Sequence, residues 1–198
     1  MQDTPVVMVR RTMDRLPTHS LPDGFGIRNY RQGDERRWAE IEHAADEFDS
    51  REAALARFLH DFGDELPEME DRCFFVVEQQ GGRAIGTATA WYDTNFHGEV
   101  YGRVHWVAVV PDFQGRKLAK PLMCAVMERL KQSHTRAYLT THTRCAKAIR
   151  MYLDFGIEPH QAYPTCEDAW RYLAGLLDHP ALAIYRNQPG QPTTRSEE

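Results

Sequence analysis

An apolar strand that runs straight into an amphipathic helix is the feature that most constrains this chain. The stretch from Val100 to Val110 is rich in strand-forming residues and stops at Pro111. Beyond it, large apolar residues recur every four positions from Leu118 to Leu130, which predicts a helix from about 116 to 132. Pro121 fits this helix because it falls in the first turn, where its missing N–H costs little. A short strand at Tyr138 to Thr141 follows, so we predict a strand–helix–strand crossover.

The residues before and after this crossover also alternate between strand and helix patterns. Gly81 and Gly82 separate two apolar runs and predict a hairpin. Asp34 and Ser50 are expected to cap two helices. We predict strands at 27–30, 73–79, 84–92 and 180–186, a turn at 93–98, and helices at 35–46, 50–62, 146–156 and 167–177. The fold class is therefore α/β (α+β): a mixed, mainly antiparallel central sheet with helices on both faces.

Composition limits the domain count and the partners. The 198 residues suffice for one domain, which we expect at 24–188, after an extension or loosely docked arm at 1–23 and before a disordered tail at 189–198. A net charge of -5 gives no general attraction to nucleic acid or to anionic membranes. No apolar run approaches the ~18 residues of a membrane span. The four cysteines lack metal-finger spacing, which favours reduced thiols and a cytoplasmic protein without a metal site.

The start of the crossover helix carries a pattern typical of an anion site. A loop with few bulky side chains leaves backbone N–H groups unsatisfied there, and the helix dipole adds partial positive charge. Arg116, Lys117 and Lys120 add three formal charges, so a pyrophosphate is a suitable ligand. The alternative is an ordinary strand-to-helix turn whose basic residues only solubilise the surface.

Two motifs make the sequence similar to the GNAT superfamily of N-acetyltransferases. V-A-V-V-P-D-F-Q-G-R-K-L-A, from Val107 to Ala119, resembles the family's coenzyme A signature. It has Lys117 where the family usually has glycine. A-I-R-M-Y-L-D-F-G-I, from Ala148 to Ile157, resembles the later family motif, with Cys145 where an asparagine often stands. The resemblance implies acetyl-CoA as donor, no metal cofactor, a primary amine acceptor of unknown identity and, as in many relatives, a homodimer. The alternative is a non-catalytic domain that binds coenzyme A or a protein partner.

The resemblance also implies which residues bind the coenzyme. Val107 and Val109 would offer backbone groups to the pantetheine arm, and Tyr152 would lie near the thioester sulfur. Cys145 is also expected to contact the coenzyme. The pyrophosphate would be wrapped by the loop residues Gln114, Gly115, Arg116, Lys117, Leu118, Ala119 and Lys120.

Acetyl transfer to an amine needs a base and benefits from an acid. Tyr152 matches the tyrosine that many family members use to protonate the leaving thiolate, although it also fits a packed helix face. His105 is the candidate base, because strand alternation places Arg103, His105, Val107 and Val109 on one face and imidazole has a suitable pKa. A half-buried structural histidine is the alternative reading. Weaker candidates for the base are Glu78, Asp93 and Glu99, and the family resemblance also allows for no dedicated base. The oxyanion donor implied is the Val109 N–H.

Overall fold

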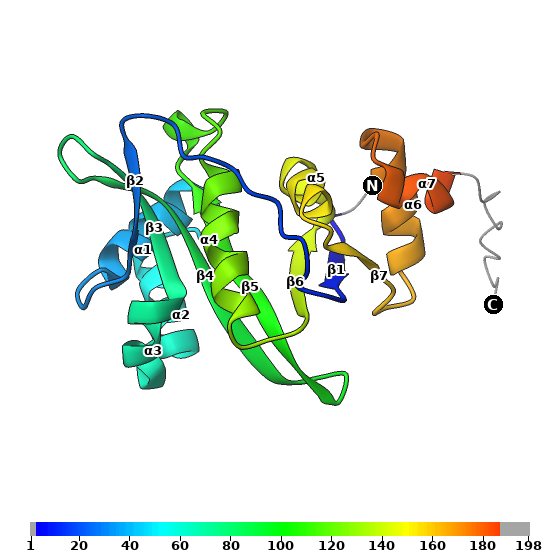
Figure 1. The fold of residues 1–198 in the computed structure, drawn as a ribbon, viewed down its shortest axis with the longest axis horizontal. Helices are drawn as coiled ribbons and strands as arrows, with labels where there is room; N and C mark the ends of the chain where they lie inside the picture. Colours follow the sequence, from blue (N-terminus) through cyan, green and yellow to red (C-terminus); the bar gives the residue numbers. More distant parts are fainter. Residues whose placement is uncertain (1–2, 187–198) are drawn as a thin grey trace. The chain divides into compact units, whose positions relative to one another are not determined.

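The structure is a computed structural model that describes residues 3–186 (Figure 1). The disordered tail predicted at 189–198 lies outside the described residues. The chain groups into two compact units: residues 10–139 form the larger, and residues 3–9 with 140–186 form the smaller. Within the described part of the chain, no helix is both long and apolar enough to cross a membrane.

The larger unit contains the predicted hairpin and crossover. Its strands are β2 (Phe25–Asn29), β3 (Cys73–Glu78), β4 (Ala84–Phe96) and β5 (Glu99–Val109), with the first half of β6 (Ala137–His142). Neighbouring strands from β2 to β5 are antiparallel, whereas β5 and β6 are parallel through Gly102 opposite Ala137. This mixed, mainly antiparallel sheet confirms the predicted fold class.

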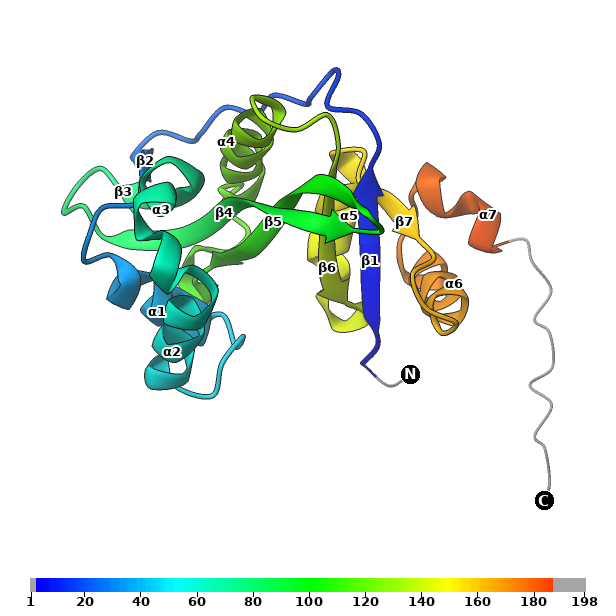
Figure 2. The ribbon, with the colours of Figure 1, turned by 90° about the horizontal axis from the view of Figure 1, so that it is seen from below.

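Helices cover both faces of these strands. They are α1 (Glu35–Ala44), α2 (Arg51–Phe62), α3 (Leu66–Arg72) and α4 (Ala119–Lys131). Figure 2 shows α1 and α2 on one face and α4 on the other. The four-residue repeat of α4 is buried as predicted, with Leu122, Val126 and Leu130 fully covered. On the opposite face Trp38 and Phe58 are fully buried and their rings lie 5.3 Å apart, so each face of the sheet has its own apolar layer.

Three boundaries in the larger unit differ from prediction. Helix α4 begins at Ala119 rather than near Arg116, because left-handed backbone at Gly115 and Lys117 keeps the preceding segment out of the helix. Strand β4 runs on to Phe96, so the turn expected at 93–98 consists of His97 and Gly98 alone, both with positive φ. Short helix α3 was not predicted.

The two predicted helix caps have different outcomes. Ser50 Oγ accepts a 3.1 Å hydrogen bond from the Ala53 amide, so this cap is confirmed. Asp34 stands at the N-cap of α1 but makes no capping hydrogen bond, so that prediction is wrong. Its carboxylate is bound by the Arg28 and Arg37 guanidinium groups instead.

The smaller unit corrects two predictions about the chain ends. It contains β1 (Pro5–Arg10) up to Val9, the second half of β6, α5 (Ala146–Asp154), β7 (Glu158–His160), α6 (Cys166–Leu176) and α7 (Ala183–Arg186). The N-terminal segment is not loosely docked at β1, because Val6 to Val9 are buried and β1 pairs antiparallel with β7. The strand predicted at 180–186 is wrong: a 3₁₀ turn leads into α7. Leu182 and Tyr185 are both buried at helical spacing, and the Arg186 guanidinium donates to the Ala174 carbonyl.

Candidate active site

The loop that leads into α4, which we call the α4 entry loop (residues 113–118), is exposed to solvent between its two ends. Phe113 and Leu118 are buried at its two ends, whereas residues 114–117 are all exposed. The N-cap position of α4 is Leu118, and no side chain caps this helix. The N-cap residue of this 13-residue helix therefore offers no side-chain acceptor to the first turn, an arrangement that favours a bound anion.

Contacts to the neighbouring strand and rings hold this loop in place. Gln114 Nε2 donates a 3.0 Å hydrogen bond to the carbonyl of Val109, the last residue of β5. Phe113 packs edge-on against Phe25 with ring centroids 6.2 Å apart. The Arg116 guanidinium lies 4.5 Å from the centre of the Phe113 ring, so this cation is positioned over the loop's anchor.

Lys117 takes the backbone conformation for which glycine is normally required. Its φ is +62°, close to the +77° of Gly115 two residues earlier. A side chain in this region costs about 1 kcal/mol, which the rest of the loop must offset. The lysine therefore does not change the loop's handedness, and it adds a positive charge at the helix entrance.

A β-bulge interrupts strand β5 beside the predicted base. Thr87 pairs with Ala108 but Thr89 pairs with His105, so two residues of β5 oppose one residue of β4. Trp106, inside the bulge, has a φ of +50°. As a result the side chains of His105 and Trp106, adjacent in sequence, both reach Asp61. The prediction that alternation continues unbroken from Arg103 to Val109 is wrong at Trp106.

Asp61, in the last turn of α2, is the centre of a polar cluster that was not predicted. Its Oδ2 accepts hydrogen bonds from Trp106 Nε1 at 3.0 Å and from Arg57 Nε at 2.9 Å. The same oxygen lies 3.4 Å from His105 Nε2. Burial alone would raise the pKa of Asp61, but hydrogen bonds from His105, His60, Arg57 and Trp106 outweigh it and hold the pKa well below its ordinary value. In the sequence its only visible partner is Arg57, four residues earlier on the helix.

Only 10% of the His105 side chain is exposed. Burial lowers its pKa from 6.5 to about 4, although the Asp61 carboxylate acts in the opposite direction. The imidazole is therefore neutral at physiological pH. Because Asp61 accepts at Nε2, the ring carries its proton there and Nδ1 holds the basic lone pair.

Aromatic rings surround this cluster on the α1 and α2 face. Trp106 lies 5.6 Å from Trp38 and 5.2 Å from Phe48, measured between ring centroids, and Phe62 lies 5.9 Å from His105. One turn along α1 from Trp38, Glu42 is fully buried, and neither carboxyl oxygen has a hydrogen-bond partner among the described residues. Burial raises the pKa of Glu42 well above its ordinary value, which favours the neutral form of this carboxyl.

Two of the alternative bases have other partners. Asp93 accepts the Tyr138 hydroxyl at 2.7 Å and the Asn95 amide at 2.8 Å. Glu99 forms a 2.6 Å ion pair with Arg136. Within residues 3–186, no group of three or more histidine, cysteine, aspartate or glutamate side chains is arranged to hold a metal ion.

The remaining predicted site residues belong to the smaller unit. Tyr152 lies on α5 with 6% of its surface exposed, next to buried Leu153. Gly156 follows with a φ of +67°, as expected for the residue that ends this helix. Cys145 is half-buried at the end of the 3₁₀ turn that leads into α5.

Comparison with known proteins assigns the fold and the family. The family profile "Acetyltransferase (GNAT) family" matches residues 35–157, and the chain belongs to this family. The match spans β3, β4 and β5, the α4 entry loop, the crossover and α5. Membership supports acyl transfer as the class of chemistry. No protein with a curated description matches the sequence.

Solved structures give the same fold. A GCN5-related N-acetyltransferase from Sphaerobacter thermophilus aligns with a TM-score of 0.60 and 22% identity over 80% of this chain and 48% of its own. An acetyltransferase from the GNAT family of Colwellia psychrerythraea aligns at 0.59 and 9% identity, over 80% of this chain and 54% of its own. A tandem GNAT protein from the clavulanic acid biosynthesis pathway aligns at 0.55 and 15%, over 79% and 50%. The chain thus spans about half the length of these proteins, and at these identities the likeness establishes the fold alone.

Proposed function

We propose that this protein is an acetyl-CoA-dependent N-acetyltransferase that acts on a primary amine. The observation that carries the proposal is the α4 entry loop: four consecutive exposed residues with two left-handed positions, ahead of a helix without a side-chain cap. A pyrophosphate fits such a loop because it accepts several N–H bonds at once. Arg116, Lys117 and Lys120 supply compensating charge.

The rest of the coenzyme site is proposed from the family motifs. The backbone of Val107 and Val109 would bind the pantetheine arm as an added strand, as in β-augmentation. Gln114, Gly115, Leu118 and Ala119 would complete the pyrophosphate loop, and Cys145 would line the site. Bound acetyl-CoA supplies the acetyl group as an activated thioester.

His105 is proposed to accept the proton of the amine. An alkyl ammonium has a pKa of ~10.4 and no lone pair, so it must be deprotonated before or during attack. As the amine nitrogen bonds to the acetyl carbon, its remaining protons become strongly acidic, and a weak base then suffices. Asp61 fixes the imidazole with Nδ1 as the basic atom and stabilises the imidazolium that forms. Trp106 and Arg57 in turn hold Asp61.

Two further roles complete the proposed mechanism. The backbone N–H of Val109 would donate to the oxygen that gains negative charge. Tyr152 would donate its hydroxyl proton to the departing sulfur. Both roles rest on the positions of these residues in the family motifs.

Coenzyme binding and turnover are tested separately. Coenzyme A at 100 times its dissociation constant should raise the free energy of unfolding by about 2.7 kcal/mol, measured by thermal shift. Release of free thiol from acetyl-CoA is then followed against polyamines, amino acids, aminoglycosides and peptides. No thermal shift would overturn the proposal at its first step.

A non-catalytic coenzyme A-binding domain is the second candidate. The low pKa of His105 favours this candidate, since an imidazole with a pKa of about 4 is a weak base. Cys145 also favours it, because it replaces the asparagine that often stands in the family motif. A clear thermal shift without thiol release from any amine would support this candidate over the enzyme.

Cellular context and assembly are also proposals. All four cysteines are free thiols, which fits a reducing compartment such as the cytoplasm. We propose that residues 24–188 form one domain and that two copies form a homodimer. Light scattering after size-exclusion chromatography measures the oligomeric state.

A further inference from the structure

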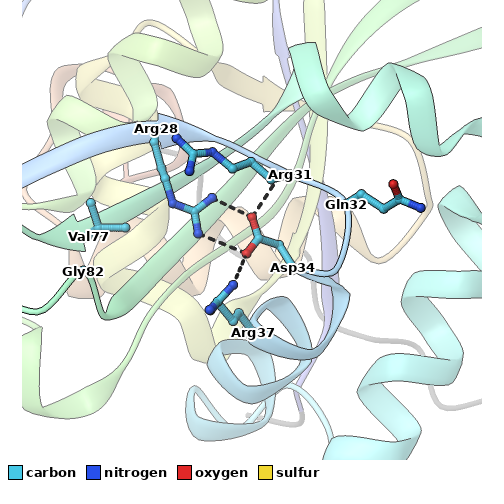
Figure 3. Close-up of a pocket in the computed structure, with 7 residues that line it drawn as sticks. All are labelled: Arg28, Arg31, Gln32, Asp34, Arg37, Val77 and Gly82. Carbon is cyan, nitrogen blue, oxygen red and sulfur yellow. Dashed lines mark hydrogen bonds and ion pairs between the residues drawn. The ribbon is translucent and has the colours of Figure 1, made fainter.

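A pocket of about 390 Å³ opens in the larger unit between β2 and the start of α1 (Figure 3). It includes no residue of the α4 entry loop and none of the Asp61 cluster. Its charged and small lining residues are Arg28, Arg31, Asp34, Arg37, Val77 and Gly82.

Asp34, the only carboxylate that lines this pocket, already accepts four hydrogen bonds. Asp34 is buried, and Oδ2 accepts from Arg28 Nη1 at 2.6 Å and from the Arg31 amide at 2.9 Å. Its Oδ1 accepts from Arg28 Nη2 at 3.0 Å and from Arg37 Nη1 at 2.6 Å. Burial acts to raise the pKa of Asp34, but these hydrogen bonds keep it below its ordinary value. Asp34 is therefore ionised and has little capacity for another donor.

Three guanidinium groups and one carboxylate leave an excess of two positive charges. Arg28 is held in place, since it binds Asp34 with both terminal nitrogens and lies 5.0 Å over the Phe75 ring. Among residues 3–186, the Arg31 side chain has no hydrogen bond or ion pair. Figure 3 shows it extended toward Arg28 rather than away from it. A second cation that extends toward Arg28 adds positive charge that the single Asp34 carboxylate does not neutralise.

We propose that this pocket binds the phosphate group of a ligand. A phosphate monoester carries about −1.5 to −2 charges near neutral pH, which balances the excess, whereas a carboxylate balances only half of it. The planar guanidinium fork matches two phosphate oxygens. The volume exceeds that of one phosphate, because it corresponds to roughly thirteen waters at ~30 Å³ each. The pocket therefore has room for part of the group that carries the phosphate.

Within this arrangement the three arginines have different tasks. Arg28 and Asp34 form the fixed part of the pocket, since Arg28 donates to both oxygens of the buried Asp34 carboxylate. Arg31 and Arg37 are more exposed and supply the charge that the ligand neutralises. Arg31→Gln and Arg37→Gln are therefore the informative variants. The matched control is Arg36→Gln, because Arg36 is an exposed arginine of the same helix that does not line the pocket.

The test is calorimetric titration of inorganic phosphate into the full chain, at an ionic strength held constant with chloride. Because phosphate also suits the α4 entry loop, the titration is run on the protein with and without saturating coenzyme A, and on Lys117→Gln. We expect phosphate to bind the wild type and Lys117→Gln alike. Arg31→Gln and Arg37→Gln should each weaken binding by about tenfold, as expected for the loss of one charged hydrogen-bond donor.

Three results would overturn this inference. The first is an absence of phosphate binding to the wild type. The second is equal weakening by Arg36→Gln, which would indicate a general charge effect. The third is loss of phosphate binding in Lys117→Gln, which would place the ion at the α4 entry loop. The titrations without coenzyme A keep the outcome independent of the proposed acetyltransferase activity, since they need no coenzyme binding.

Discussion

His105 Nε2 lies 3.4 Å from Oδ2 of Asp61, which joins a bulged strand to the end of a helix 44 positions earlier in the chain. The bulge places Trp106 on the same oxygen. A carboxylate with three donors around one oxygen is held rigidly, so it can fix both the orientation and the tautomer of the imidazole. This is the relationship expected of a positioned base rather than of an isolated core histidine.

Asp61→Asn tests this relationship. The amide cannot stabilise an imidazolium, and its NH₂ group favours the tautomer with the wrong nitrogen protonated. We expect kcat to fall by about 100-fold or more, which is the usual range for a disabled general base. Coenzyme A binding, measured by thermal shift, should stay within twofold of the wild type.

His60→Gln is the matched control for that variant. His60 also contacts Asp61, at 3.0 Å from Oδ1, but its side chain is 79% exposed. Removing it should leave kcat near the wild-type value. If Asp61→Asn and His60→Gln reduced kcat equally, the proposed role of the His105–Asp61 pair would be wrong.

The contribution of His105 to the free energy of unfolding should fall as the pH drops from 6.5 to 4. The folded pKa of His105 is about 4 and the unfolded pKa is 6.5, so over this range only the unfolded chain binds the proton. The stabilisation is fully present above pH 6.5 and is lost as the pH falls to the folded pKa of about 4. The loss is about 3 kcal/mol, at 1.36 kcal/mol per pKa unit. Urea unfolding at a series of pH values measures it.

His105→Gln tests whether His105 causes this pH dependence of the free energy of unfolding. The variant has no imidazole at this position, so its free energy of unfolding should depend less on pH between 6.5 and 4. Asp61 also has a lowered pKa, but its stabilisation is lost only below its unfolded value of ~3.9. An unchanged slope in His105→Gln would show that other groups cause the decline.

The parts of the fold that could be predicted are those governed by local periodicity. The repeat from Leu118 to Leu130 determined the buried face of α4, and Ser50 gave the start of α2. The pairing of β1 with β7 brings together residues about 150 positions apart, and three-residue β7 has too few positions to show alternation. Leu182, at the end of the 3₁₀ turn, and Tyr185, in α7, are three residues apart, a spacing too short to distinguish a helix from a strand.

The prediction of the site residues had the same limit, because several of their positions depend on contacts between elements that are far apart in the sequence. Alternation along β5 fails at Trp106 because a bulge depends on how β4 pairs with it, which one strand's sequence does not encode. Asp61 had no signal beyond its spacing from Arg57, since His105 and Trp106, which also contact it, come from another element. The α4 entry loop was predictable because its residues are contiguous and glycine marks the turn.

Substitutions at Lys117 separate backbone shape from charge. Lys117→Gly keeps φ near +62° without strain and loses one cation, so coenzyme A affinity should fall only a few-fold. Lys117→Val loses the same charge but is a β-branched residue, which strongly disfavours positive φ. Its affinity, measured by titration calorimetry, should fall at least tenfold further. Equal affinities for the two variants would mean that the left-handed conformation at this position does not matter for binding.

Tyr152→Phe tests the proposed acid with little structural disturbance. Tyr152 is 6% exposed and a phenylalanine ring fills the same space, so only the hydroxyl is removed. The free energy of unfolding should drop by at most about 1 kcal/mol, the net worth of a typical hydrogen bond. Coenzyme A affinity should be retained while kcat falls by 10-fold or more, because the thiolate then leaves without a proton donor. Tyr172→Phe, at a 39% exposed tyrosine of α6 outside both family motifs, should change neither quantity. A Tyr152→Phe enzyme with full kcat would assign the tyrosine to packing alone.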